Sequence, residues 1–204
     1  MTHIMLQTPL RASDPRPRVE HVLFREWALS SNQPYTLTLG YTAGYPASST
    51  RNRIVQQFLA SQCDVLMMLD DDQWPAFNPF GYIDLDKDIL GFPYPSLRIN
   101  DPVNIIPWFP APMSDAGLQR VNYVGGGMMI IARRVLESIR APFADVYDAD
   151  GIFTEGEDLS FCRRAVEAGF EIWCDMSAPL AHVKPAEMLT LWKVAQYGLS
   201  KTDT

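Results

Sequence analysis

The chain has 204 residues, a formal net charge of −7, 47% hydrophobic residues and 20% charged residues. This composition is typical of a globular protein, and the length favours one domain. The acidic balance and the absence of a long Lys/Arg run argue against a nucleic-acid-binding protein. Cys63, Cys162 and Cys174 form no CxxC pair, so we expect buried free thiols and no disulfide framework.

The ends of the chain carry no strong targeting signal. Residues 1–10 lack the charged and apolar regions of a signal peptide, and no segment approaches the roughly 20 apolar residues of a membrane span. We therefore expect a cytoplasmic protein. Residues 186–199 are amphipathic at helical spacing, with Met188, Leu191, Trp192 and Ala195 on one side. A helix packed on its own domain is the favoured interpretation, and a membrane-surface or partner helix is the alternative.

The hydrophobic pattern predicts alternating strands and helices in the first half of the chain. A helix is expected over 17–31, with Val19, Val22, Leu23, Phe24 and Trp27 facing inward. A second helix, capped by Ser49 or Thr50, should run to residue 62. Strands are predicted over 3–8, 35–41, 65–69 and 89–92.

The second half begins with a long segment, 93–122, that is rich in Pro, Asn and Trp and predicts loops. Strands follow over 128–132 and 170–174, and helices over 133–139 and 157–168. The order predicts an α/β fold: a Rossmann-like, mainly parallel central sheet flanked by helices. Ligands of such sheets bind beyond the carboxyl ends of the strands.

Three consecutive carboxylates follow the apolar run 65–69 at one of these strand ends. In extended chain Asp70 and Asp72 would face one ligand, while Asp71 would point elsewhere. Adjacent carboxylates repel one another unless they are solvated or neutralised, and oxygen ligands suit Mg²⁺ or Mn²⁺. A solvated acidic turn is an equally good interpretation of the triplet by itself.

Further polar residues follow other predicted strands. Glu157 and Asp158 begin a helix, where carboxylates cap backbone N–H groups, but a carboxylate at the mouth of the sheet can also serve as a general base. His182 is a candidate third metal ligand and Lys184 a candidate diphosphate partner. For each residue an ordinary surface or structural role is the alternative.

Two other features are compatible with a ligand site. Gly125, Gly126 and Gly127 allow close backbone approach and positive φ, although a tight turn is the favoured interpretation of the triplet by itself. Arg51 and Asn52 open the predicted second helix, where a nucleotide phosphate or base could bind, or where an exposed helix residue could simply lie.

Taken in chain order, these segments resemble the glycosyltransferases of the GT-A fold, close to the family 2-like branch and its short phage and bacterial members. The resemblance covers roughly residues 51–184 and rests on an ordered set of motifs. They are Arg51-Asn52, Leu69-Asp70-Asp71-Asp72 with Trp74-Pro75, Gly91-Phe92-Pro93-Tyr94-Pro95, Gly125-Gly126-Gly127-Met128 with Arg133-Arg134, Gly156-Glu157-Asp158-Leu159-Ser160-Phe161-Cys162 with Gly169, and His182.

The resemblance implies a metal-dependent, inverting transfer of a sugar from a nucleotide sugar to a hydroxyl acceptor. Mn²⁺ or Mg²⁺ would be held by Asp70, Asp72 and His182, with Asp158 as catalytic base assisted by Glu157. A UDP-sugar is the favoured donor, whereas the acceptor and the oligomeric state stay open. The implied nucleotide contacts are Arg51, Asn52, Asp70, Asp71, Gly126, Gly127 and Lys184.

The implied organisation is a single GT-A domain over 1–204. It would comprise a nucleotide-binding half (1–92), an acceptor and catalytic half (93–185), and a C-terminal helix with tail (186–204). Two alternatives stay open: a nucleotidyltransferase acting on a sugar phosphate, and a non-catalytic nucleotide-sugar-binding module. The absence of glycine from residues 8–18 disfavours the first, because nucleotidyltransferases normally carry a Gly-rich first loop with Lys or Arg.

Overall fold

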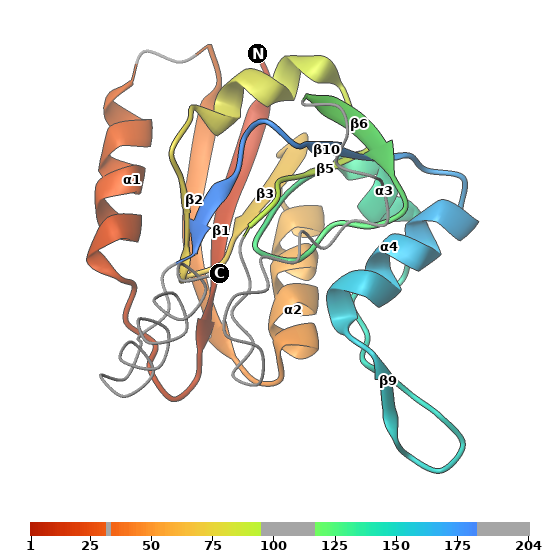
Figure 1. Cartoon of the computed structure of the whole chain (residues 1–204). Helices are drawn as coiled ribbons and strands as arrows, with labels where there is room; N and C mark the ends of the chain where they lie inside the picture. Colours follow the sequence, from red (N-terminus) through yellow and green to blue (C-terminus); the bar gives the residue numbers. More distant parts are fainter. Residues whose placement is uncertain (32–33, 95–116, 183–204) are drawn as a thin grey trace, which may run out of the picture.

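The computed structural model describes residues 1–31, 34–94 and 117–182 (Figure 1). Within these residues, seven strands form one mixed sheet in the order β2-β1-β3-β7-β5-β10-β6. The pairs β1–β2, β1–β3 and β5–β10 are parallel; β7 is antiparallel to both neighbours, and β6 is antiparallel to β10. The strands are β1 (His3–Arg11), β2 (Thr36–Gly44), β3 (Val65–Leu69), β5 (Ile89–Gly91), β6 (Leu118–Val121), β7 (Met128–Ala132) and β10 (Ile172–Asp175).

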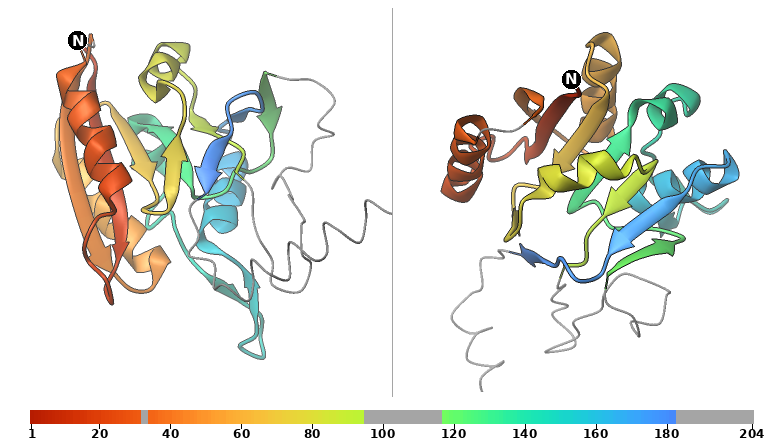
Figure 2. Two further views of the ribbon diagram at one scale, coloured as in Figure 1. Left: turned by 60° about the vertical axis from the view of Figure 1, so that its left-hand side comes forward. Right: turned by 90° about the horizontal axis from the view of Figure 1, so that it is seen from above.

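Helices cover both faces of this sheet, as the two views of Figure 2 show. Buried residues of α2 (Ala47–Ala60), α3 (Arg133–Ser138) and α4 (Glu157–Glu167) share one core with one face of the sheet. Buried residues of α1 (Val19–Ser30) and of the 3₁₀ helix η1 (Pro79–Leu85) share a second core with the other face. The prediction of a mainly parallel sheet flanked by helices is thus confirmed.

Strand β3 shows why a continuous apolar run marks a central strand. Leu66 and Met68 point into the core under α2, while Met67 and Leu69 point into the core under α1. Successive side chains of a strand alternate between faces, so a strand covered on both sides must be apolar at every position. The same alternation holds from Met128 to Ile131 along β7, whose five residues are all buried.

Two short two-stranded sheets lie beside the main one. β4 (Gln73–Pro75) pairs antiparallel with β11 (Leu180–His182), so that the end of the described chain returns to the segment after the Asp triplet. β8 (Val146–Tyr147) and β9 (Phe153–Glu155) form a hairpin that projects from the body, below α4 in the view of Figure 1.

Several element boundaries differ from the sequence predictions. α2 begins at Ala47, after Pro46, and β1 continues to Arg11 because its last residues pair with the equally long β2. β6 lies in the segment predicted to be all loop and pairs with β10, a long-range contact without a local signal. No described helix is long and apolar enough to cross a membrane. Residues 95–116 and the predicted C-terminal helix lie outside the described residues.

The predicted inward face of α1 is wrong. Of the five residues expected inside, only Phe24 is buried, and the buried residues of the helix are His21, Phe24, Arg25 and Ala28. Arg25 donates from Nη2 to the Thr8 hydroxyl and to the Gly40 carbonyl, so polar partners on β1 and β2 select this face. The stripe of Val19, Val22, Leu23 and Trp27 is left largely exposed.

Candidate functional site

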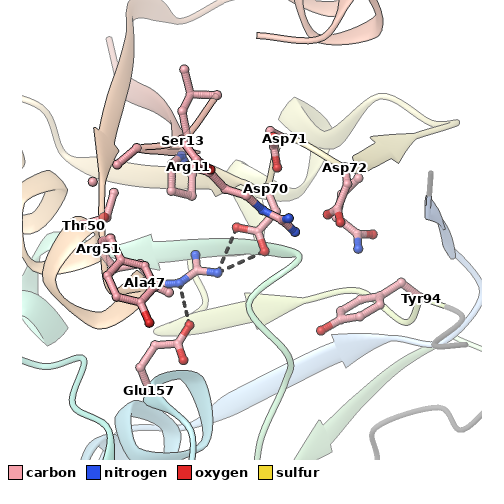
Figure 3. A pocket seen from close by; sticks show the side chains of 16 residues that line it. Arg11, Ser13, Ala47, Thr50, Arg51, Asp70, Asp71, Asp72, Tyr94 and Glu157 are labelled. Atoms are coloured by element: carbon pink, nitrogen blue, oxygen red, sulfur yellow. Dashed lines mark hydrogen bonds and ion pairs between the residues drawn. The ribbon is translucent and has the colours of Figure 1, made fainter. Parts of the chain in front are cut away.

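A cavity of about 740 Å³ opens at the carboxyl ends of β1, β2 and β3, beside the N-terminus of α2. This is the edge where the parallel strand order places a ligand site. Figure 3 shows its side chains pointing toward one another from these elements and from α4. The lining residues are Pro9, Leu10, Arg11, Ala12, Ser13, Gly44, Tyr45, Ala47, Thr50, Arg51, Asp70, Asp71, Asp72, Gln73, Tyr94 and Glu157.

The three Asp residues form a turn between β3 and β4, not the extended chain that the predicted alternation requires. The Asp70 carbonyl accepts from Gln73 N at 3.1 Å, and Asp70 N donates to the Gly127 carbonyl at 2.9 Å. Because the chain turns here, Asp71 is not directed away, and all three carboxylates line the cavity. Asp72 is the most enclosed of them, with 8% of its surface exposed.

Arg51 joins two of the predicted motifs. Its Nη2 donates to both carboxylate oxygens of Asp70, at 2.8 and 3.0 Å, and its Nε donates to Glu157 at 3.2 Å (Figure 3). The guanidinium is buried and comes from the second turn of α2, not from the exposed helix start that the sequence suggested. Its Nη1 atom is buried and has no hydrogen-bond partner among the described residues.

The site carries more negative than positive charge. Burial raises the pKa of Asp70 to about 7; Arg51 opposes this shift, and Asp72 and Glu157 add to it. Burial by itself would lower the pKa of Arg51, but the carboxylates of Asp70, Glu157 and Asp158 raise it. One buried guanidinium thus faces several carboxylates, an environment that favours a further cation.

Glu157 and Asp158 begin α4 and have different partners. Glu157 lines the cavity and accepts from Arg51, as described above. Asp158 accepts from Gly126 N through Oδ2 and from Leu159 N through Oδ1, both at 2.9 Å. Each Asp158 oxygen therefore accepts one backbone hydrogen bond, which fixes the carboxylate against the glycine turn.

The glycine triplet gives space to side chains of the site. A Cβ atom at Gly126 would lie 2.5 Å from Arg51 Nη2, and one at Gly127 would lie 2.8 Å from the Tyr94 ring. None of the three glycines has a positive φ, so the predicted use of left-handed backbone does not apply. Because these glycines have no side chain, the turn can lie close to the Arg51 guanidinium and the Tyr94 phenol.

The remaining predicted residues are Asn52, His182 and Lys184, and none of them lines the cavity in the part of the chain that the structure describes. The Asn52 amide is bonded to the backbone of Phe143, donating to its carbonyl at 2.6 Å and accepting from its N–H at 3.1 Å, away from the cavity. His182 lies opposite Gln73 in the β4–β11 pair, one residue from Asp72. Lys184 lies outside the described residues.

The cavity is also lined by polar residues to which the sequence analysis gave no role, among them Arg11, Gln73 and Tyr94. Arg11 is an exposed cation at the end of β1, visible only once β1 is known to extend beyond residue 8. Gln73 is buried, and its Oε1 has no hydrogen-bond partner among the described residues. Tyr94 belongs to one of the motifs quoted above, and burial, together with the carboxylates of Asp158, Asp70 and Asp72, raises its pKa.

The sequence predicts Asp70, Asp72 and His182 as metal ligands. Among the described residues, no three His, Cys, Asp or Glu side chains are arranged to hold a metal ion. Mg²⁺ and similar ions need only one or two protein carboxylates, because waters and substrate phosphates complete the shell. Asp72 and the unpaired carbonyl oxygen of Gln73 are adjacent oxygen donors on an acidic turn, so the residues present are compatible with such an ion.

Comparisons with known proteins identify the fold. No protein-family model and no curated protein sequence matches the chain. Among solved structures, A197 from STIV matches with a TM-score of 0.60 and 16% identity over 91% of this chain and 87% of A197. The structure of GalNAc-T7 with UDP, GalNAc and Mn²⁺ matches with a TM-score of 0.51 and 13% identity, over 91% of this chain and 44% of that one. The chain has a GT-A-like, Rossmann-type fold.

Proposed function

We propose that the chain is a metal-dependent, inverting glycosyltransferase of the family 2-like GT-A branch. The observation that carries this proposal is the convergence of Asp70, Asp72, Arg51 and Glu157 at one cavity, with Asp158 beside it, at the carboxyl ends of the parallel strands. Residues far apart in sequence meet at a cavity that carries excess negative charge. The volume of this cavity lies in the range of small-molecule binding sites.

The proposed donor is a UDP-sugar with Mn²⁺ or Mg²⁺. GalNAc-T7 was crystallised with UDP, GalNAc and Mn²⁺, which supports this choice on a shared fold. Asp72 and Gln73 would hold the cation together with the diphosphate, with His182 as a further ligand and Asp70 fixed beside it by Arg51. When bound, the cation supplies Lewis-acid stabilisation of the leaving diphosphate.

Asp158 is proposed as the general base. A bond forms between the acceptor oxygen and the anomeric carbon while the bond from that carbon to the diphosphate oxygen breaks, and the acceptor proton goes to a carboxylate oxygen of Asp158. The backbone N–H groups of Gly126 and Leu159 orient this carboxylate. General-base assistance of this kind contributes roughly 10²- to 10⁴-fold in rate. One in-line displacement inverts the anomeric configuration.

Two other functions share part of this geometry. A nucleotidyltransferase acting on a sugar phosphate would use the same acidic edge of the sheet, and Arg11 supplies a cation at the end of β1. A non-catalytic nucleotide-sugar-binding module would use the cavity without Asp158. Glycosyl transfer is favoured because Asp158 is held in a fixed orientation next to the cavity.

The products of a sugar nucleotide distinguish the three functions. The chain is incubated with UDP-sugars and Mn²⁺, first in a thermal-shift screen and then with candidate hydroxyl acceptors. A bound donor at 100 times its dissociation constant stabilises by about 2.7 kcal/mol. Release of UDP with a product of opposite anomeric configuration supports the proposal. Pyrophosphate formed from a nucleoside triphosphate and a sugar phosphate would establish the nucleotidyltransferase instead, and donor binding without turnover on any acceptor would favour the binding module.

A further inference from the structure

Two arginines line the cavity of the proposed active site, and they differ in their partners. Arg51 donates from Nε and Nη2 to Glu157 and Asp70. Arg11 is exposed at the end of β1, and no ion pair or side-chain hydrogen bond joins it to another residue in the part of the chain that the structure describes. Its guanidinium therefore keeps its N–H donors for a ligand.

The backbone of Arg11 is held on both sides. In the parallel pairing of β1 with β2, Arg11 lies opposite Gly44, and Ala12 N donates to the Gly44 carbonyl at 3.2 Å. The Arg11 carbonyl accepts from Asp14 N, also at 3.2 Å, in the turn that follows the strand. The side chain thus starts from a fixed point, so little backbone ordering is needed when a ligand binds.

The Arg11 side chain extends into the cavity toward the Asp turn, as Figure 3 shows. The charged groups of the cavity are four carboxylates (Asp70, Asp71, Asp72 and Glu157) and two guanidinium groups (Arg11 and Arg51). An anionic ligand beside this turn is repelled unless positive charge lies next to it. Arg11 supplies such a charge from the wall of the cavity that β1 and β2 form.

We propose that Arg11 binds the phosphate groups of the ligand in this cavity. The inference rests on the proposed function for the identity of that ligand, a nucleoside diphosphate carrying a sugar. A guanidinium presents paired N–H donors that match two phosphate oxygens. When the bond between the anomeric carbon and the diphosphate breaks, negative charge grows on the diphosphate oxygens, and donors already placed there stabilise it.

Arg11 takes a role that the sequence analysis gave to two other cations. Arg51 is already bonded to Asp70 and Glu157, and Lys184 lies outside the described residues. Arg11 reaches the cavity because β1 is three residues longer than the sequence predicts.

Calorimetric titration of the full chain with inorganic pyrophosphate and with UDP, each with Mn²⁺, tests this assignment. Pyrophosphate carries the phosphate groups without a base or a sugar, so its binding does not depend on the choice of nucleoside. Arg11→Gln should raise the dissociation constant of both probes by at least about tenfold, the usual effect of losing hydrogen bonds to a charged group. Arg11→Lys keeps the charge without the planar pair of donors and should recover part of the loss.

The matched control is Arg16→Gln, which changes the net charge by the same amount in the same segment. The Arg16 side chain is 87% exposed and is not among the described residues that line the cavity. Its dissociation constants should stay within about twofold of wild type, because an exposed charge is screened by solvent. Equal losses for Arg11→Gln and Arg16→Gln would overturn the proposal. So would a loss of UDP binding with unchanged pyrophosphate binding, which would assign Arg11 to the nucleoside.

The outcomes separate this inference from glycosyl transfer. Binding of both probes that depends on Arg11, without turnover of any sugar nucleotide, would support the role of Arg11 and overturn the transferase. Turnover of a sugar nucleotide together with unchanged binding in Arg11→Gln would overturn the role of Arg11 alone. Absence of binding of either probe to wild type would overturn both.

Discussion

Arg51 and Asp70 form a buried ion pair in which one guanidinium nitrogen donates to both carboxylate oxygens, at 2.8 and 3.0 Å. Their side chains are 5% and 26% exposed. The first carboxylate of the predicted metal motif is therefore already bound to a cation of the protein. Arg51 therefore links α2, the Asp turn and α4.

Arg51→Met should destabilise the fold by about 3–5 kcal/mol, because it leaves the carboxylates of Asp70 and Glu157 without their buried partner. Chemical denaturation followed by circular dichroism measures this loss. Arg53→Met, an exposed position on the same helix, is the control and should change the free energy of unfolding by less than about 0.5 kcal/mol. Similar losses for the two variants would show that the ion pair contributes no special stability.

Asp158→Asn should reduce turnover by roughly 10²- to 10⁴-fold while the donor dissociation constant stays within about threefold of wild type. Asparagine keeps a carbonyl oxygen for the Gly126 N–H, loses the acceptor for the Leu159 N–H and removes the basic carboxylate, so the donor dissociation constant reports whether the site stays in place. Single-turnover kinetics and calorimetry measure the two quantities. Full activity of this variant would assign Asp158 a purely structural role.

Gly126→Ala should impair the site through Arg51, since the added Cβ would lie 2.5 Å from Nη2 and 3.0 Å from Cζ of that side chain. We expect a loss of about 1–3 kcal/mol of stability, typical of a forced repacking. Gly81→Ala is the control, because a Cβ there meets no heavy atom within 4 Å. Thermal unfolding of the two variants checks the difference, and an unaltered Tm for Gly126→Ala would contradict the contact.

Asp72→Asn should weaken Mn²⁺-dependent binding of the donor by at least about tenfold, whereas Asp150→Asn, the same charge change on the exposed β8–β9 loop, should not. Titration calorimetry with and without Mn²⁺ measures the effect. Removal of the ion with a chelator should reduce donor affinity in wild type and leave the Asp72→Asn affinity almost unchanged. An equal effect of the chelator on the donor affinity of wild type and of Asp72→Asn would show that Asp72 does not bind the ion.

His21 should make the fold less stable at acidic pH. Burial lowers its pKa below the ordinary value of 6.5, and Arg25 adds to this shift, while Asp71 and the backbone of Gln73 and Asp70 oppose it. The unfolded chain then binds more protons as the pH falls below 6.5, so the free energy of unfolding decreases, by at most about 1.4 kcal/mol per pH unit. His21→Gln should remove this part of the pH dependence, measured as unfolding at pH 8 and pH 5. An identical slope in the variant would assign the dependence to other groups.

The strongest local patterns predicted the core of the fold. The apolar runs at 65–69 and 128–132 are the central strands β3 and β7. The first and last residues of both strands are those predicted from the sequence. A strand buried on both faces must be apolar throughout, so its sequence carries the information by itself. Helix α4 was also predicted to within one residue, from a large apolar face and acidic residues at its start.

The face that α1 turns to the sheet could not be predicted from its periodicity. Its apolar stripe is a real signal, but the partners of Arg25 and His21 lie on β1 and β2, outside the helix. A buried guanidinium that loses its hydrogen bonds destabilises the fold, so the bonds of Arg25 outweigh the preference of the apolar residues for the core.

The sequence alone determined the alternating α/β pattern, the acidic strand end and the residues that were candidates for chemistry, because each depends on neighbours along the chain. Tertiary structure decided that Asp70 pairs with Arg51, that Asp158 is bonded to the glycine turn and that Asn52 belongs to the scaffold. Those contacts join residues 19, 32 and 91 positions apart, and a local pattern carries no information about distances of that kind.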